Sequence, residues 1–340
     1  MGIERLYEAP AVGSLTPVAP GVQWLRLPLP FQLDHINVWL LEEEAHYTLV
    51  DCGANLPEVA AIWDQLAKTL FATKPLKRII VTHAHPDHIG MAAPLMRIHG
   101  TSLQMSMSEY LFTRAMCGHL DGFDGVTAGR FMASHGLVDE AAEETLRARG
   151  KLFSNLVPEP PLSFLRMQHG DEILIAGRIW RCHEGYGHST EHISLICDEL
   201  KLMISGDMLL PTISTNVSVY GLEPEANPLQ LFLKSVESMA TLSDELTVLP
   251  SHGVPFKGVH ERCAQLLRHH EHRLKELLAA LKDAPMSAAQ AVGVLFRRKM
   301  DGHQMSFALG EAVAHLHYLW RKGLVVRTQE NGVWKFQTPL

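Results

Sequence analysis

The chain has 340 residues, of which 46% are hydrophobic and 20% are charged, a composition that is typical of a folded globular protein and excludes extensive disorder. Its formal net charge of −7 argues against a surface built as a whole for nucleic acid or anionic lipid. The five cysteines are dispersed, and neither an apolar leader nor a membrane-length apolar run is present. We therefore expect a cytoplasmic protein with free thiols and no membrane partner.

The first part of the sequence alternates short strand-like runs with turns. Strands are expected at 22–27, 36–41, 47–50 and 78–82, with a helix at 59–70 and another beginning near Gly90. From about residue 105 to 160 helix-forming residues replace this alternation, which predicts a helical insertion into a sheet protein.

Strand patterns return at 172–175, 179–182, 193–197, 202–205 and 247–249, with helices at 229–239 and 260–281. Helices at 287–296 and 307–321 then precede two strands joined by Asn331-Gly332, a strong hairpin signal. Helices followed by a hairpin are typical of a winged helix. The chain is thus divided into a domain at 1–258, a connector helix at 259–283 and a winged-helix-like domain at 284–340.

Three histidines and an aspartate lie within six positions directly after the predicted buried strand at 78–82. The segment reads His-Ala-His-Pro-Asp-His, from His83 to His88. Alternate residues of an extended loop project the same way, so His83 and His85 can ligate one metal ion while Asp87 and His88 project toward a neighbouring ion. This spacing predicts a metal site much more specifically than two histidines alone.

Three further candidate ligands each follow a predicted strand: His188, Asp207 and His252. Taken singly, Gly-Asp and His-Gly pairs are common in turns. Their recurrence at successive strand ends predicts that they join the histidine-rich loop.

This order of motifs resembles the metallo-β-lactamase-fold hydrolase superfamily, in particular its glyoxalase II-like, hydroxyacylglutathione hydrolase-like branch. The likeness includes Leu49-Val50-Asp51-Cys52-Gly53 and covers most of residues 15–258. It implies an α/β fold, a four-layer αββα sandwich with the site at one edge between two sheets. The C-terminal hairpin module resembles the winged-helix domain of some members, including an endoribonuclease-like branch.

The resemblance also implies a ligand set. His83, His85 and His188 would bind one ion, Asp87, His88 and His252 a second, and Asp207 would bridge them. Imidazole and carboxylate ligands suit Zn(II) first, then Fe(II) or Mn(II). Seven ligands favour two divalent ions that share a hydroxide, which attacks a thioester or ester carbonyl. Asp87 and Asp207 are the expected catalytic residues.

Several other residues near these motifs have weaker roles. His192 is expected to support a ligand by a hydrogen bond, and Tyr186, where the family usually has proline, either faces the substrate or packs. The histidines at 269, 270 and 272 are expected on a solvated helix face. His315 and His317 are expected at the surface or between domains.

The substrate is open at this stage. The insertion carries large apolar residues that would either form a wall for an acyl chain or only attach the insertion to the domain or to a second subunit of a homodimer. The first hypothesis is a small-molecule (thio)esterase. The alternatives are a phosphodiesterase or endoribonuclease, a winged-helix DNA-binding sensor, and a mononuclear iron persulfide dioxygenase. The helix at 307–321 has few basic residues, so nucleic acid is possible but not favoured.

Overall fold

The first of two large sheets is built by the N-terminal part of the chain. A computed structural model of the protein describes residues 2–118, 120, 122–123, 125–137, 152–297, 300 and 302–339. The sheet has seven strands in chain order: β2 (Leu15–Ala19), β3 (Val22–Pro28), β4 (His35–Glu42), β5 (Tyr47–Val50), β6 (Leu76–Ile80), β7 (Ser102–Met105) and β8 (Leu165–Arg166). Strands β2 to β5 pair antiparallel, whereas β5 to β8 pair in parallel. The predicted strands are all present.

The second sheet also has seven strands and comes mainly from the later part of the chain. Its order is β1 (Glu4–Arg5), β14 (Phe256–Lys257), β13 (Thr247–Pro250), β12 (Leu202–Gly206), β11 (His192–Cys197), β10 (Arg178–Gly185) and β9 (Glu172–Ile175). Only β12 and β13 pair in parallel within it. The short strands β1, β2, β7, β8 and β14 were not predicted, because two to five residues carry little periodicity.

Three hydrophobic cores separate four layers, as expected for an αββα sandwich. Between the sheets, Trp24 and Trp39 of the first sheet meet Trp180 of the second, and all three are fully buried. A second core fills the space between the first sheet and its outer helices, and a third lies on the outer face of the second sheet. Because both faces of the central strands are covered, β4 and β5 read as nearly continuous apolar runs.

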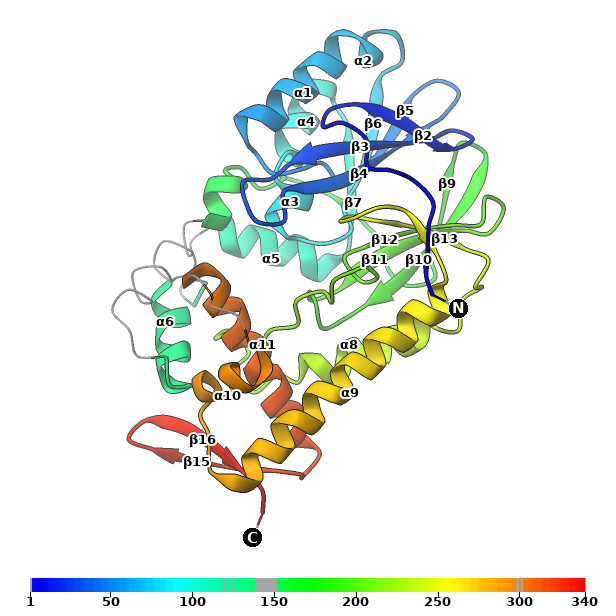
Figure 1. Ribbon diagram of the computed structural model, residues 1–340. Coiled ribbons are helices and arrows are strands. Elements are labelled where there is room, and N and C mark those ends of the chain that lie inside the picture. Colours follow the sequence, from blue (N-terminus) through cyan, green and yellow to red (C-terminus); the bar gives the residue numbers. More distant parts are fainter. Residues whose placement is uncertain are drawn as a thin grey trace.

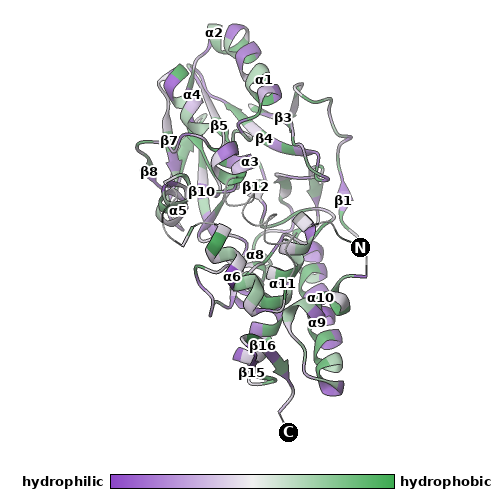
Figure 2. Cartoon of the chain, turned by 90° about the vertical axis from the view of Figure 1, so that its left-hand side faces the viewer, coloured by the Kyte–Doolittle hydropathy of each residue, from purple (hydrophilic) through white to green (hydrophobic). Residues whose placement is uncertain are grey.

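The helices cover the two outer faces (Figure 1). On the first sheet lie α1 (Pro57–Lys68), α2 (Leu70–Thr73), α3 (Pro86–Ile89), α4 (Ala92–His99) and α5 (Met107–Cys117). On the other side lie α6 (Gly125–Ser134), α8 (Pro228–Met239), α9 (Val259–Asp283), α10 (Ala288–Leu295) and α11 (Gly302–Arg321). Helix α9 alternates hydrophilic and hydrophobic segments along its length (Figure 2), as an amphipathic helix does. No helix among the described residues is both long and apolar enough to cross a bilayer.

The C-terminal helices share one core with the second sheet. Leu309 and Val313 of α11 belong to the same buried cluster as Phe232 of α8 and Val248 of β13. The hairpin β15 (Val326–Glu330) and β16 (Val333–Gln337) lies at the far end of α9 from the sheets (Figure 1). Its turn has positive φ at Asn331 and Gly332, as the sequence predicted. The domain division at residues 258 and 283 remains a prediction from sequence.

Helix α11 is buried along most of its length, from Ser306 to Leu319. Of the two positions expected for His315 and His317, at the surface or between domains, the surface is wrong because both are fully buried. His317 Nδ1 lies 2.9 Å from the carbonyl oxygen of Ala226, a residue of the predicted first domain. The expected solvated face is also wrong at His270, which is fully buried, although His269 and His272 are exposed. A helix enclosed in this way cannot enter a DNA groove, which weakens the DNA-binding sensor hypothesis.

The predicted helical insertion contains α5 and α6, while residues 138–151 of it lie outside the described residues. Its apolar side chains divide between two cores. Phe112 and Met116 pack beneath the first sheet, whereas Phe131 and Met132 pack with the C-terminal helices. These four residues attach the insertion to the protein, so the acyl-wall hypothesis loses its main candidates.

The shared core predicts how the C-terminal helices unfold. Leu309→Ala empties part of it and should lower the free energy of unfolding by about 2–5 kcal/mol. Calorimetry and circular dichroism should show one transition moved to lower temperature. Leu324→Ala, at a side chain that is 47% exposed, is the control and should cost less than about 0.5 kcal/mol. A separate, earlier transition for the C-terminal helices alone would contradict the shared core.

Candidate metal centre

Four loops that follow strands meet between the two sheets. The loop from His83 to His88 follows β6 of the first sheet. His188 follows β10, Asp207 follows β12 and His252 follows β13, all in the second sheet. Because the sheets are stacked face to face, loops at this shared edge can bring together side chains that lie far apart in sequence.

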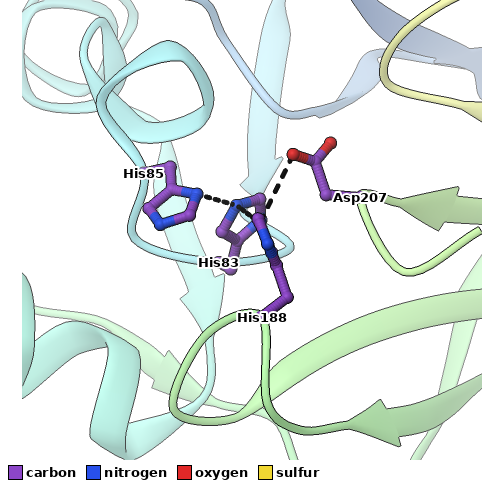
Figure 3. A group of neighbouring side chains, drawn as sticks. All are labelled: His83, His85, His188 and Asp207. Atoms are coloured by element: carbon purple, nitrogen blue, oxygen red, sulfur yellow. Dashed lines mark hydrogen bonds and ion pairs between the residues drawn. The ribbon is translucent and has the colours of Figure 1, made fainter. Parts of the chain in front are cut away.

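The first group of candidate ligands is His83, His85, His188 and Asp207, whose ligand atoms all lie within 4.8 Å of one another. Figure 3 shows the three imidazole rings and the carboxylate turned toward one another. His83 Nε2 lies 2.8 Å from His85 Nδ1 and 3.3 Å from His188 Nε2. His188 Nε2 lies 3.4 Å from Asp207 Oδ2. Such a convergence of imidazole and carboxylate atoms is typical of the donor set of a borderline divalent ion.

The second group is Asp87, His88 and His252, whose ligand atoms also lie within 4.8 Å of one another. Asp87 Oδ2 is 3.7 Å from His88 Nε2 and 3.5 Å from His252 Nε2. All seven predicted ligands therefore lie in two adjacent groups, and Asp207 of the first group also faces the second, as the resemblance implied for a bridging ligand.

Asp207 connects the two groups because its oxygens face different partners. Oδ2 faces His188, whereas Oδ1 lies 3.5 Å from His88 Nε2 and 3.4 Å from His252 Nε2. Burial raises the pKa of this carboxyl group, but His252, His88 and His188 together hold it well below its usual value. Asp207 thus remains ionised, in the position expected of a bridging ligand.

Hydrogen bonds at Nδ1 fix which nitrogen of three histidines faces the cluster. His188 Nδ1 lies 2.8 Å from the carbonyl oxygen of Asn216, and His252 Nδ1 lies 2.7 Å from that of His35. Since a carbonyl oxygen can only accept, both Nδ1 atoms carry the proton. His88 Nδ1 likewise donates to Asp51 Oδ2 at 2.8 Å. In each ring Nε2 is therefore the nitrogen that faces the cluster.

The donor set fits metal ions. His88 Nε2 and Asp207 Oδ1 are buried with no hydrogen-bond partner in the described part of the chain, a costly arrangement unless another group binds them. Burial, reinforced by the neighbouring histidines, lowers the pKa of His83 and of His85 well below the usual value. Both rings are therefore neutral, as metal ligation requires.

Asp51 lies directly behind His88, and no role was predicted for it from the sequence. It is fully buried, and it accepts hydrogen bonds from the backbone N–H of Thr82 at 2.8 Å and from His88 Nδ1. Its φ of 58° is unusual for a residue other than glycine. A carboxylate that holds a ligating histidine in this way sets the tautomer of the ring. The turn Asp51-Cys52-Gly53 was the available signal.

Glu109, on the first turn of α5, joins two of the ligand loops. It is 1% exposed and accepts hydrogen bonds from Ala84 N at 2.8 Å, Thr190 Oγ1 at 2.8 Å and Glu191 N at 2.7 Å. The insertion therefore begins by tying the His83–His88 loop to the His188 loop. No pattern in the sequence distinguishes Glu109 from a surface glutamate.

The two weaker candidates have different surroundings. His192 is fully buried, and its Nε2 accepts a hydrogen bond from the backbone N–H of Asp207 at 3.2 Å, which places it behind a ligand. Tyr186 donates its hydroxyl to Glu184 Oε2 at 2.9 Å, and its backbone N–H donates to Ser235. These two hydrogen bonds of Tyr186 are therefore with residues outside the cluster.

Comparisons with known proteins point to one family over most of the chain. The family model described as metallo-β-lactamase superfamily matches residues 32–252, and a model for a metallo-β-lactamase-like C-terminal domain matches residues 274–339. A β-lactamase domain protein from Burkholderia ambifaria has a crystal structure that is 44% identical, with a TM-score of 0.92, over 99% of this chain and 98% of that one.

Two further relatives are more distant. A metallo-β-lactamase family protein from Thermus thermophilus is 27% identical, with a TM-score of 0.80, over 95% of this chain and all of that one. The protein named probable metallo-hydrolase YqjP of Bacillus subtilis is 24% identical over 92% of this chain and 97% of its own length.

The contact between β12 and His192 yields a prediction about stability. Gly206 has a φ of 53°, and a Cβ atom there would lie 2.1 Å from His192 Nε2. Gly206→Ala combines the cost of a left-handed alanine, about 1–2 kcal/mol, with displacement of the ring. In urea unfolding of the metal-free protein, the free energy of unfolding should therefore fall by clearly more than about 1–2 kcal/mol.

Gly170→Ala is the matched control, because Gly170 has a φ of 83° but no atom within 4 Å of the added Cβ. The free energy of unfolding of Gly170→Ala should fall only by the cost of a left-handed alanine, about 1–2 kcal/mol. The double variant Gly206→Ala/His192→Ala should recover part of the difference. Equal losses in the two glycine variants would show that His192 does not pack where the structure places it.

Proposed function

This chain belongs to the metallo-β-lactamase superfamily and is a metal-dependent hydrolase, and we propose that it holds two divalent ions side by side to hydrolyse a thioester or ester. The position of Asp207 carries the proposal, because one carboxylate faces two separate groups of imidazoles. Zn(II) is the favoured metal for such ligands, with Fe(II) or Mn(II) as the alternatives.

Each residue of the cluster has a proposed role. His83, His85 and His188 would bind the first ion, Asp87, His88 and His252 the second, and Asp207 would bind both. When bound, a pair of ions of this kind supplies Lewis acidity and a water whose pKa is lowered toward neutrality. Asp51 and the carbonyl groups of His35 and Asn216 keep three of the rings in the tautomer that this binding needs.

The exposure of the cluster residues indicates the side from which a substrate would reach them. His85 and Asp87 are the partly exposed members of the cluster, whereas the other five residues are buried. Substrate and solvent would therefore reach the cluster on the side of the His85–Asp87 segment. Two catalytic roles are proposed: Asp87, which is partly exposed, would face the incoming substrate and help to hold the second ion, and Asp207, which is buried, would hold both ions.

Apolar residues near the ligand supports favour a carbon-rich substrate. Leu33 lies two residues before His35 and is 36% exposed, and Ile213 lies two residues before Thr215 and is 45% exposed. An acyl group suits such neighbours better than a polyanionic backbone does. The enclosed helix α11 and the net charge of −7 also weigh against the phosphodiesterase alternative.

Metal content tests the two-ion proposal. Purified protein saturated with Zn(II) should contain about two equivalents by mass spectrometry, and Asp207→Ala should bind less than one and lose roughly 100-fold or more in kcat/KM. Tyr186→Phe, which removes only the hydroxyl that binds Glu184, should keep both ions. Two ions and full turnover in Asp207→Ala would refute the bridging role. One iron with oxygen consumption would instead favour the persulfide dioxygenase.

A substrate panel tests the bond that is cleaved. Acyl-CoA thioesters, glutathione thioesters, lactones and bis-nitrophenyl phosphate should be offered to the zinc-loaded enzyme, with single-stranded RNA as a further substrate. We expect thioester or ester turnover that Asp87→Ala abolishes, because Asp87 is the partly exposed carboxylate of the cluster. RNA cleavage that depends on Asp87, without thioester turnover, would replace the esterase proposal with the endoribonuclease alternative.

A further inference from the structure

The orientation of His188 depends on a segment without regular structure. Residues 210–219, here called the strap, form no helix or strand. The strap places Thr215 Oγ1 and the carbonyl oxygen of Asn216 each 2.8 Å from His188 Nδ1. The carbonyl fixes the proton on Nδ1, so the strap decides that Nε2 faces His83 and Asp207. Contacts that fix the position of the strap therefore also fix the orientation of His188.

Helix α9 binds the first half of the strap. Arg262 is buried, and it donates from Nε to the carbonyl oxygen of Leu210 at 2.5 Å and from Nη2 to that of Ile213 at 2.7 Å. His270, fully buried, has its Nε2 3.3 Å from Ser214 Oγ. A buried guanidinium group that donates to two carbonyl oxygens of an irregular segment satisfies backbone groups that have no partner in a sheet or helix.

Helix α11 binds the second half of the strap by close approach of the backbones. Val219 N donates to the carbonyl oxygen of Gly310 at 3.2 Å. A Cβ atom at Gly310 would lie 2.7 Å from Ser218 Oγ and 2.8 Å from Ser218 Cβ. Ser218 Oγ in turn donates to Asn216 Oδ1 at 2.7 Å. Glycine at position 310 thus allows the contact that leads to Asn216.

Helices α9 and α11 are hydrogen-bonded to each other beside the strap, through His270 and His315, and the donor and acceptor of this bond can be assigned. His315 Nδ1 lies 2.8 Å from the carbonyl oxygen of Glu311, so this nitrogen carries the proton. His315 Nε2 therefore accepts from His270 Nδ1 at 3.2 Å, and His270 Nε2 accepts from Ser214. Burial lowers the pKa of His270 to about 2 and that of His315 to about 4, which keeps both rings neutral.

We propose that α9 and α11 act as a brace for the metal centre: they fix the strap so that Thr215 and Asn216 hold His188 in its ligating orientation. Arg262, His270 and Gly310 are then positioning residues that touch neither metal nor substrate. The proposal rests on the proposed metal-binding function. It gives the C-terminal helices a role in the site itself, in place of nucleic-acid recognition.

The test compares two glycines of the C-terminal helices. Gly310→Ala forces Ser218 away, whereas Gly293→Ala on α10 meets no atom within 4 Å and is the matched control. Zn(II) affinity is measured by competition with a chromophoric chelator. We expect Gly310→Ala and His270→Phe to weaken one of the two zinc equivalents by about 10- to 100-fold, with partial recovery in His270→Gln, which retains an acceptor for Ser214. Gly293→Ala should bind zinc as the wild type does.

A second readout does not depend on bound metal or on folding of the glycine variants. ¹⁵N NMR of the zinc-free wild type should show His188 protonated at Nδ1, and Thr215→Val should retain the fold but broaden or shift that signal. Zinc affinities within twofold of the wild type in both Gly310→Ala and His270→Phe, or an unchanged His188 signal in Thr215→Val, would overturn the brace. A wild type that binds no zinc at all would instead refute the proposed function.

Discussion

The structure of the site depends on the carboxylate of Asp207, which lies among imidazole rings that are mostly buried. Asp207 and four of the six other members of the cluster are buried, and burying so many polar atoms is unfavourable unless each has a partner. The chain supplies partners for Nδ1 in three rings and leaves the Nε2 atoms facing one another. Two buried atoms, His88 Nε2 and Asp207 Oδ1, keep no hydrogen-bond partner within the described residues. Divalent ions are the groups that would satisfy this arrangement.

Support for the cluster is spread over all four layers. Asp51 and Glu109 hold the His83–His88 loop from the side of the first sheet and α5. His192 holds Asp207 from within the second sheet, and the strap holds His188 from the side of α9 and α11. The site is therefore formed by the stacking of the layers, and parts of the chain that seem peripheral in sequence contribute to its geometry. This arrangement explains why the C-terminal helices share a hydrophobic core with the second sheet.

The C-terminal region shows that one sequence pattern can be consistent with two different structures, an exposed winged helix or a helix enclosed in the protein. Helices followed by an Asn-Gly hairpin are typical of a winged helix, and the hairpin is present with the expected turn. The same helix that would read DNA in that interpretation is buried from Ser306 to Leu319. Its apolar and histidine side chains face other helices, and the histidines that looked like surface residues form hydrogen bonds inside the protein. Whether α11 is exposed or buried decides between these two structures, and this exposure is a property of the tertiary structure.

The sequence by itself determined most of the strands, the hairpin and the seven candidate ligands, because periodicity and the spacing of His83, His85, Asp87 and His88 are local features of the chain. It also determined the family, since ligands at successive strand ends recur in a fixed order. Only the tertiary structure decided that Asp51 and Glu109 support the loops and that His270 and His315 are buried. These features depend on contacts between residues 25 to more than 100 positions apart, and no local pattern encodes which face of a helix another layer will cover.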